Sequence, residues 1–153
     1  MDRLIMFIAT GFGSGYLPKA PGTWGTLPAL PLHYLLTLLP LPWHYTALGI
    51  IFVIAVLFSG SAEKILDRGD PGIVVIDEIN GMLVALLFAP HNYLYWFLAF
   101  VVFRFFDIVK PFPIGFVDKR FHGGLGIVLD DFIAGLFTLG CMQLLYKFLP
   151  WFG

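Results

Sequence analysis

The chain has 153 residues, a formal net charge of −1, 59% hydrophobic and only 12% charged residues, and its mean hydropathy is +0.87. A soluble domain of this size would lack the polar surface to cover itself, and the near-zero charge excludes the basic surface of a nucleic-acid-binding protein. The single Cys141 excludes a framework of internal disulfides and a Cys-ligated structural zinc. We therefore expect one membrane-embedded domain over residues 1–153.

The N-terminal segment begins with Arg3 and a short apolar stretch, Leu4 to Ala9. The stretch is short for a signal peptide and no small-residue cleavage site follows it, so we expect it to belong to the mature fold. A polar segment, GFGSGYLPKAPGTWGT, covers residues 11–26. The flexible backbone at Gly22 and the hydroxyl group of Thr23 are candidate substrate contacts, and an equally good interpretation makes Thr23 a plain helix N-cap.

Apolar runs separated by proline-containing breaks follow in chain order. Residues 42–62 and 127–149 are long enough to cross a bilayer as helices. Residues 27–39 and 81–89 are shorter than the roughly 20 residues that a crossing needs, so we predict short or re-entrant helices that form hairpins with the segments after them. The alternative interpretation joins residues 79–103 into one kinked span.

The distribution of charge favours the hairpins. Eight of the nine Lys and Arg residues lie at the N-terminus or in three polar segments, residues 11–26, 61–78 and 104–131. The positive-inside rule places these segments on the cytoplasmic side. A kinked span would put Glu78 and Arg104 on opposite faces, whereas hairpins keep them together. We therefore predict an all-α, polytopic membrane bundle with one acidic site at the cytoplasmic face.

Carboxylates at the ends of the apolar runs are the main candidates for chemistry. They are Asp77, Glu78, Asp107, Asp130 and Asp131. Ionisable groups at such positions are costly unless they are paired, hydrated or bound to a metal. Oxygen ligands without a His or Cys cluster favour Mg²⁺ or Mn²⁺ over zinc, so the sequence predicts a divalent metal site. The alternative is that these groups form only ion pairs that join helices.

Two basic residues lie near Asp107 in the sequence. Arg104, Asp107 and Lys110 recur at every third position, which places them near one face of a helix that ends before Pro111. Such a stripe suits a phosphate bound through a bridging metal, with bidentate contacts from Arg104 and a point charge from Lys110. The alternative for Lys110 is snorkelling to the membrane interface. Asp118 is a minor candidate.

A glycine-rich loop precedes the last apolar run. Backbone N–H groups at Gly123, Gly124 and Gly126 could bind an anion at the start of that helix, so we predict substrate contacts at Gly123 and Gly124. His122 beside them is interpreted as a surface residue, with a proton donor as the alternative. The remaining charged residues of the second polar segment are interpreted as a solvated helix end and turn: Glu63, Asp67, Arg68 and Asp70.

Four ordered motifs resemble those of the phosphatidylglycerophosphatase A family, and together they cover nearly the whole chain. The motifs are PGTWGTLPALPL (residues 21–32), DEINGM (77–82), FRFFDIVKPFPI (103–114) and HGGLGIVLDDFIAG (122–135). The resemblance implies an Mg²⁺-dependent phospholipid phosphatase that converts phosphatidylglycerophosphate to phosphatidylglycerol and phosphate. It also implies a multi-pass protein of the bacterial inner membrane whose active site faces the cytoplasm.

The five carboxylates named above are the positions that correspond to the family's acidic motif residues. The resemblance implies that all five bind Mg²⁺, with Asp77, Glu78, Asp107 and Asp131 as catalytic residues. A carboxylate not fully engaged by the metal, Asp131 or Glu78, would serve as base toward a metal-activated water. The alternative function is an ion- or proton-coupled transporter that uses the acids as a relay. The sequence leaves the oligomeric state open.

Overall fold

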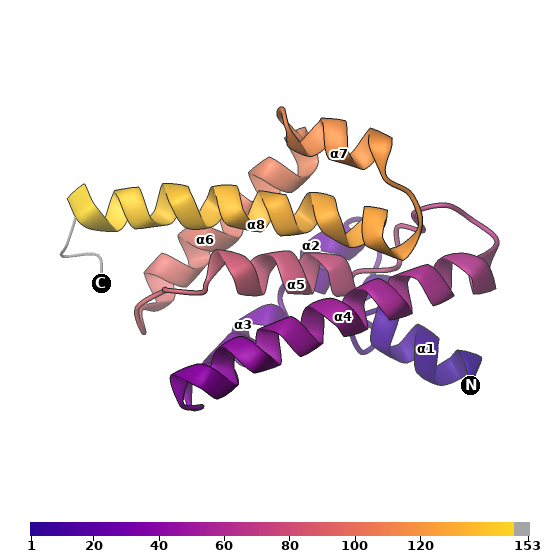
Figure 1. The fold of residues 1–153 in the computed structure, drawn as a ribbon, viewed down its shortest axis with the longest axis horizontal. Coiled ribbons are helices and arrows are strands. Elements are labelled where there is room, and N and C mark those ends of the chain that lie inside the picture. The colour runs from indigo at the N-terminus through magenta and orange to yellow at the C-terminus, as the bar shows by residue number, and fades with distance from the viewer. Residues whose placement is uncertain (149–153) are drawn as a thin grey trace.

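The structure is a computed structural model that describes residues 1–148. In this part of the chain every regular element is a helix (Figure 1), which confirms the prediction of an all-α fold. The last apolar run was predicted to end at Leu149, which lies outside the described residues. The elements are α1 (Asp2–Ala9), a 3₁₀ helix (Ser14–Tyr16), α2 (Pro21–Thr26), α3 (Ala29–Thr37), α4 (Leu41–Leu66), α5 (Ile76–Ala85), α6 (Tyr93–Val109), α7 (Ile114–Arg120) and α8 (Gly123–Phe148).

Two helices, α4 and α8, are long and apolar enough to cross a membrane. Each has 26 residues, and the mean hydropathy of the best 18-residue window is 2.0 in α4 and 1.7 in α8. A helix of this length extends about 39 Å, which exceeds the roughly 30 Å of a hydrocarbon core. Along its middle, α4 exposes the large apolar side chains of Ile50, Val53 and Leu57. These two helices correspond to the two long apolar runs of the sequence.

The second predicted hairpin consists of α5 and α6. Helix α5 ends at Ala85, the chain turns, and Asn92 caps α6 by accepting a 2.9 Å hydrogen bond from the backbone N–H of Leu94. Arg104 Nη1 on α6 lies 3.9 Å from Glu78 Oε1 on α5, so the two charged ends are on the same side. The alternative of one kinked span through residues 79–103 is therefore wrong.

Helix α5 lies at the centre of the molecule and runs alongside α8 (Figure 1), and a pair of glycines lies at the closest approach of the two helices. A Cβ atom added at Gly135 would lie 2.3 Å from the carbonyl oxygen of Gly81, and one added at Gly81 would lie 2.5 Å from that of Asp131. Helices approach this closely only where no side chain separates their backbones. This close approach therefore brings the start of α5 beside the turn of α8 that carries Asp131.

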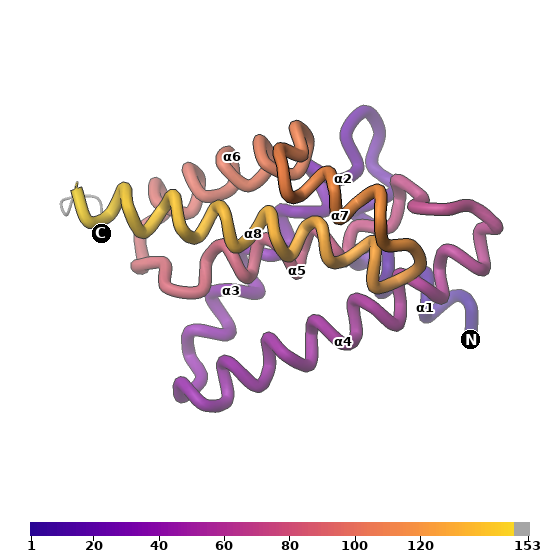
Figure 2. The backbone as a smooth tube through the Cα atoms, turned by 45° about the horizontal axis from the view of Figure 1, so that its top comes forward, coloured from indigo at the N-terminus to yellow at the C-terminus, as the bar shows by residue number. Residues whose placement is uncertain are grey.

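A second glycine pair joins α8 to α4 near the same end of the molecule. A Cβ at Gly124 would lie 2.0 Å from the carbonyl oxygen of Val56 and 2.7 Å from the backbone nitrogen of Gly60. Away from this contact, α4 diverges from α8, as both ribbon and tube show (Figures 1 and 2). The two glycine contacts together fix α4, α5 and α8 around one end of the bundle.

Helix α2 and the end of α1 support the start of α5. A Cβ at Gly25 would lie 2.3 Å from Val75 Cβ, and one at Gly22 would lie 2.3 Å from Glu78 Oε1, so the glycines of α2 allow it to pack closely there. The backbone N–H of Val75 donates a 2.9 Å hydrogen bond to the carbonyl oxygen of Ala9. The first turn of α5, with Asp77 and Glu78, is held from both sides.

Candidate metal and phosphate site

A polar cavity of about 240 Å³ lies among the starts of α5 and α8, the end of α6, and α7. Within residues 1–148, its wall combines many carboxylates with one lysine and includes no arginine. The charged lining residues are Glu63, Asp70, Asp77, Glu78, Asp107, Lys110, Asp118, Asp130 and Asp131. Eight carboxylates facing one ammonium group leave a large excess of negative charge, which calls for further cations when the acids are ionised.

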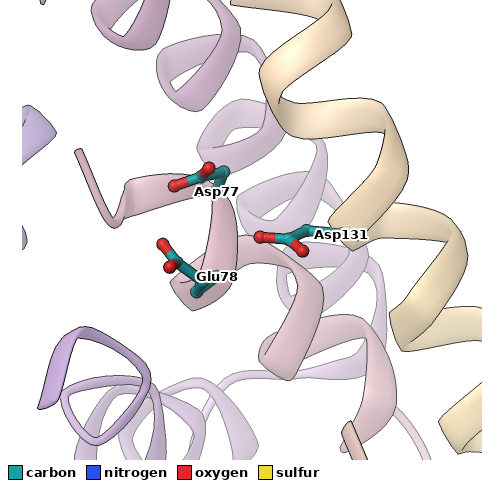
Figure 3. Close-up of side chains that lie close together, drawn as sticks. All are labelled: Asp77, Glu78 and Asp131. Atoms are coloured by element: carbon teal, nitrogen blue, oxygen red, sulfur yellow. The ribbon is translucent and has the colours of Figure 1, made fainter. Parts of the chain in front are cut away.

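Three of these acids converge. Asp77 and Glu78 come from the first turn of α5 and Asp131 comes from α8, and Asp131 points toward the other two (Figure 3). One oxygen from each lies within 4.8 Å of the others. Asp77 is only 6% exposed and Asp131 only 3% exposed, so water reaches them poorly. The predicted acidic cluster is therefore assembled around these three residues.

The donor atoms of this group fit a hard divalent cation. Asp77 Oδ1, Glu78 Oε2 and Asp130 Oδ1 are buried and have no hydrogen-bond partner. A buried polar atom without a partner is costly, and a bound cation would remove that cost. The cluster contains only carboxylate oxygens, which are the ligands that Mg²⁺ prefers. Asp77, Glu78 and Asp131 could thus hold Mg²⁺, with Asp130 Oδ1 close by on α8.

Arg104 is placed behind the acids rather than in the cavity. Its Nη1 atom contacts Asp107 Oδ2 one helical turn away and lies 3.9 Å from Glu78 Oε1. It is absent from the cavity lining. The predicted pairing of positions 104 and 107 along one helix face is confirmed, and in this arrangement Arg104 offsets the charge of Asp107 and Glu78.

Lys110 differs from the predicted stripe, because α6 ends at Val109. The residue follows the helix in the left-handed region, with φ 46°. Its Nζ atom donates hydrogen bonds to Asp118 Oδ1 at 2.6 Å and to Asp130 Oδ2 at 2.5 Å. Burial alone would lower the pKa of Lys110, but the bonds and charges of the two carboxylates outweigh it and raise that pKa above its ordinary value. Lys110 is therefore a permanent cation at the cavity wall, not a side chain that snorkels to the interface.

The predicted glycine contacts are only partly at the cavity. The glycines belong to the first turn of α8 instead of preceding it, and Gly123 lines the cavity. Gly124 is not part of the lining, and the backbone of α4 at Val56 lies where its side chain would be; the predicted substrate contact through its backbone N–H stays a prediction. Gly22 and Thr23 also lie outside the lining, in α2. The N-caps of α2 and of the apolar helix α3 are Ala20 and Pro28, so the capping alternative for Thr23 is wrong, and the substrate contacts at Gly22 and Thr23 stay predictions.

Several lining residues have no predicted role in the site, or only a minor one. Glu63 and Asp70 were interpreted as a solvated helix end and turn, His122 as a surface residue, and Asp118 as a minor candidate. Their positions depend on how the loop before α5 and helix α7 fold over α8. The spacing of residues along the sequence does not predict this packing. The only indication in the sequence is that these acids lie in polar segments next to apolar runs.

Comparison with known proteins identifies the family. A sequence model described as phosphatidylglycerophosphatase A matches residues 7–146. The phosphatidylglycerophosphatase A of Escherichia coli is 40% identical over 136 residues, which cover 88% of this chain and 79% of that protein. The Haemophilus influenzae protein of the same name is 36% identical over 137 residues, covering 88% and 84%.

A further relative has a different name. A protein of Bacteroides thetaiotaomicron named putative phosphatidylinositol-3-phosphatase is 39% identical over 142 residues, which cover 88% of this chain and 89% of that protein. No solved structure matches the chain. The family match spans all the elements that build the cavity, including the acid-bearing turns of α5 and α8. The chain therefore belongs to the phosphatidylglycerophosphatase A family.

Proposed function

We propose that the protein is a membrane-embedded, Mg²⁺-dependent phosphatase that hydrolyses the terminal phosphate of phosphatidylglycerophosphate to give phosphatidylglycerol and phosphate. The observation that carries this proposal is the convergence of Asp77, Glu78 and Asp131 in a polar cavity whose one lysine is Lys110. Two relatives named phosphatidylglycerophosphatase A, each covering 88% of the chain, support the substrate.

The placement of the cavity supports a lipid substrate. Helices α4 and α8 are the candidate membrane spans, and the cavity lies where the end of α4 and the start of α8 meet. Beside the cavity, the ring of Phe112 is exposed just before α7 and that of Phe116 is exposed on α7. Phe121, which follows α7, belongs to the cavity wall. A phosphorylated headgroup could enter the cavity while its acyl chains stay on the adjoining apolar surface.

The basic residues support a cytoplasmic orientation of the cavity in a bacterial inner membrane. Lys64 and Arg68 flank the cavity-lining end of α4, and Lys119 and Arg120 end α7 beside it. Lys147 lies at the opposite end of α8. Under the positive-inside rule the basic end of the bundle, with the cavity, faces the cytoplasm.

The chemistry follows from the charges. Bound Mg²⁺ supplies two things in phosphate-ester hydrolysis, which are neutralisation of the phosphoryl oxygens and a more acidic water nucleophile. Water attacks phosphorus, the bond from phosphorus to the glycerol oxygen breaks, and the departing oxygen gains a proton to become a hydroxyl group. A carboxylate of the cluster, Asp131 or Glu78, accepts the proton of the attacking water.

The basic residues have separate tasks in this proposal. Lys110 contacts a phosphoryl oxygen and offsets the charge that develops in the transition state. Arg104 neutralises Asp107 and Glu78 from behind, and so it lowers the repulsion that a phosphate dianion would meet in the cavity. Neither task requires a proton from the side chain.

A transporter that relays protons or ions is not favoured. A relay needs ionisable groups distributed across the membrane. Beyond Asn80, α5 and its C-cap carry Met82, Leu83 and Leu86, which belong to a buried hydrophobic cluster. His33 is buried beside Trp96, a member of that cluster, and His44 is buried beside His33; the cavity lining extends to neither histidine.

The decisive experiment measures phosphate release from phosphatidylglycerophosphate by detergent-solubilised protein, with EDTA and then with Mg²⁺ restored. We expect release that EDTA abolishes and Mg²⁺ restores, and none in Asp131→Asn. Asp67→Asn is the matched control, because Asp67 is exposed and lies outside the cavity lining. No release by the wild-type protein with any divalent cation would refute the proposal.

The same assay tests the headgroup. The Bacteroides relative has a name that refers to phosphatidylinositol 3-phosphate, so this lipid belongs in the panel next to phosphatidylglycerophosphate and phosphatidic acid. We expect the largest kcat/KM for phosphatidylglycerophosphate. A larger value for the inositol lipid would refute the proposed substrate and leave the phosphatase chemistry in place.

A further inference from the structure

Lys110 is the one permanent cation among the residues that line the cavity, so its position governs how a phosphate can bind. The ammonium group is fixed from two sides. Asp130 holds it from α8 with a side chain 7% exposed, while Asp118 holds it from α7 at 2.6 Å with a side chain 36% exposed. Asp118 is thus the partner that comes from neither α5 nor α8, the two helices whose acids converge.

Lys110 is the C-cap of α6, and the chain turns there toward α7. Its φ of 46° lies in the left-handed region, which is unfavourable for a residue with a Cβ. Strain of this kind persists where surrounding contacts enforce it. Here α7 packs directly on the strained residue, because a Cβ at Gly115 would lie 2.6 Å from the carbonyl oxygen of Lys110.

The two carboxylates are not equivalent. Asp130 lies next to Asp131, and its Oδ1 atom remains unpartnered while Oδ2 binds the lysine. If Asp130 were the only partner, the ammonium group would be free to move with it toward the acids of the metal cluster. Asp118 lies on a different helix, and its pull from that side keeps Lys110 at the cavity wall.

We infer that Asp118 is a positioning residue: it holds the Lys110 ammonium group where a phosphoryl oxygen of the substrate binds. This inference rests on the proposed function only for the identity of the substrate. The inference makes α7 part of the site, because this short helix carries the Asp118 carboxylate that positions the Lys110 ammonium group. It also divides the acids by role. Asp77, Glu78 and Asp131 converge on the proposed metal site, whereas Asp118 and Asp130 bind Lys110.

The test is a double-mutant cycle of Asp118→Asn and Lys110→Met. Losing one charge-assisted hydrogen bond is expected to reduce kcat/KM of Asp118→Asn by about tenfold. Because Asp118 acts through Lys110, the same substitution should have no further effect in the Lys110→Met background. Asp67→Asn, an equal change of charge at an exposed site, should leave kcat/KM unchanged.

The same double-mutant cycle can also be measured by ligand binding, which does not require the protein to hydrolyse its substrate. Binding of inorganic phosphate in the presence of Mg²⁺ is measured by calorimetry for the wild type, both single variants and the double variant. We expect the dissociation constant to rise by about tenfold in Asp118→Asn and to be equal in Lys110→Met and the double variant. Thermal unfolding of each variant reports whether α7 remains packed.

The outcomes distinguish the two proposals. An equal loss in both backgrounds, or no loss in Asp118→Asn alone, would overturn the positioning role. Absence of phosphate binding by the wild type would overturn it as well. A wild-type protein that binds phosphate with the expected non-additive pattern but hydrolyses no lipid would refute the proposed function and leave the role of Asp118 standing.

Discussion

The close approach of α5 and α8 at Gly81 and Gly135 gives the most direct test of how the fold sets the metal site. We consider the variant Gly135→Ala. The added Cβ would lie 2.3 Å from the carbonyl oxygen of Gly81, whereas ordinary contact begins at 3.4 Å. A backbone oxygen cannot rotate away as a side chain does, so the two helices must separate by roughly 1 Å.

The size of the effect follows from that displacement. Overpacking of a close interface costs about 1–3 kcal/mol of stability. We expect the free-energy effect on activity to exceed the effect on stability, because Asp77 on α5 and Asp131 on α8 would move apart by about as much as the helices separate. A misplacement of about 1 Å in a catalytic constellation can reduce the rate by about a hundredfold.

Gly140→Ala is the matched control, since it lies on the same helix and, within residues 1–148, its added Cβ would meet no atom within 4 Å beyond its chain neighbours and the surrounding backbone of α8. Both variants would be assayed for Mg²⁺-dependent phosphate release and for the midpoint of thermal unfolding in detergent. We expect Gly140→Ala to match the wild type in both measurements and Gly135→Ala to fall in both. If Gly135→Ala kept wild-type activity and the wild-type midpoint, the close approach would not set the distance between the acids.

Two further predictions concern the charges around the cluster. Arg104→Met leaves Asp107 and Glu78 without their cation, so we expect a loss of about 3–5 kcal/mol, seen as a lower unfolding midpoint; an unchanged midpoint would contradict the role of the ion pairs. Asp107→Asn removes a cavity carboxylate and the nearest ion-pair partner of Arg104, so we expect phosphate release to be abolished in a protein that still folds, with a smaller fall of the unfolding midpoint than in Arg104→Met because Glu78 remains beside the guanidinium group. Full activity of that variant would rule out Asp107 as a metal or catalytic residue.

The acidic cluster and its assembly at one end of the bundle could be predicted from the sequence, because charge is costly beside apolar runs. Asp77 and Glu78 precede one run, and Asp130 and Asp131 interrupt another, so function or pairing had to explain them. The same cost predicted the hairpin of α5 and α6, since only a hairpin returns Arg104 to the side of Glu78. The 3.9 Å contact between their atoms agrees with that reasoning.

The roles of individual glycines could not be predicted in the same way. Gly124 in a glycine-rich loop is typical of an anion site, yet its missing side chain makes room for the backbone of α4 at Val56. Gly22 similarly makes room beside Glu78. The absence of a Cβ serves either purpose equally well, and the choice depends on the neighbour that the tertiary fold supplies.

Long-range pairing was also beyond local reasoning. Lys110 was placed on the stripe of α6 because its spacing from Arg104 suits a helix, but the helix ends one residue earlier. The turn that follows, with Lys110 in the left-handed region, redirects the side chain to Asp118 and Asp130. Helical periodicity predicts the direction of side chains only within the helix. It therefore does not predict where the side chain of a residue just beyond the helix end points.

The two closely packed helices share one arrangement of acid and glycine that explains why the motifs have their spacing. On α5, Asp77 is followed four residues later by Gly81, and on α8, Asp131 is followed four residues later by Gly135. Residues four apart lie on the same face of a helix. On each helix the glycine that permits close contact is therefore one turn from the carboxylate, and the contact forces the two carboxylates together. A pair of acids with larger residues in place of these glycines would lie on helices too far apart to share one cation.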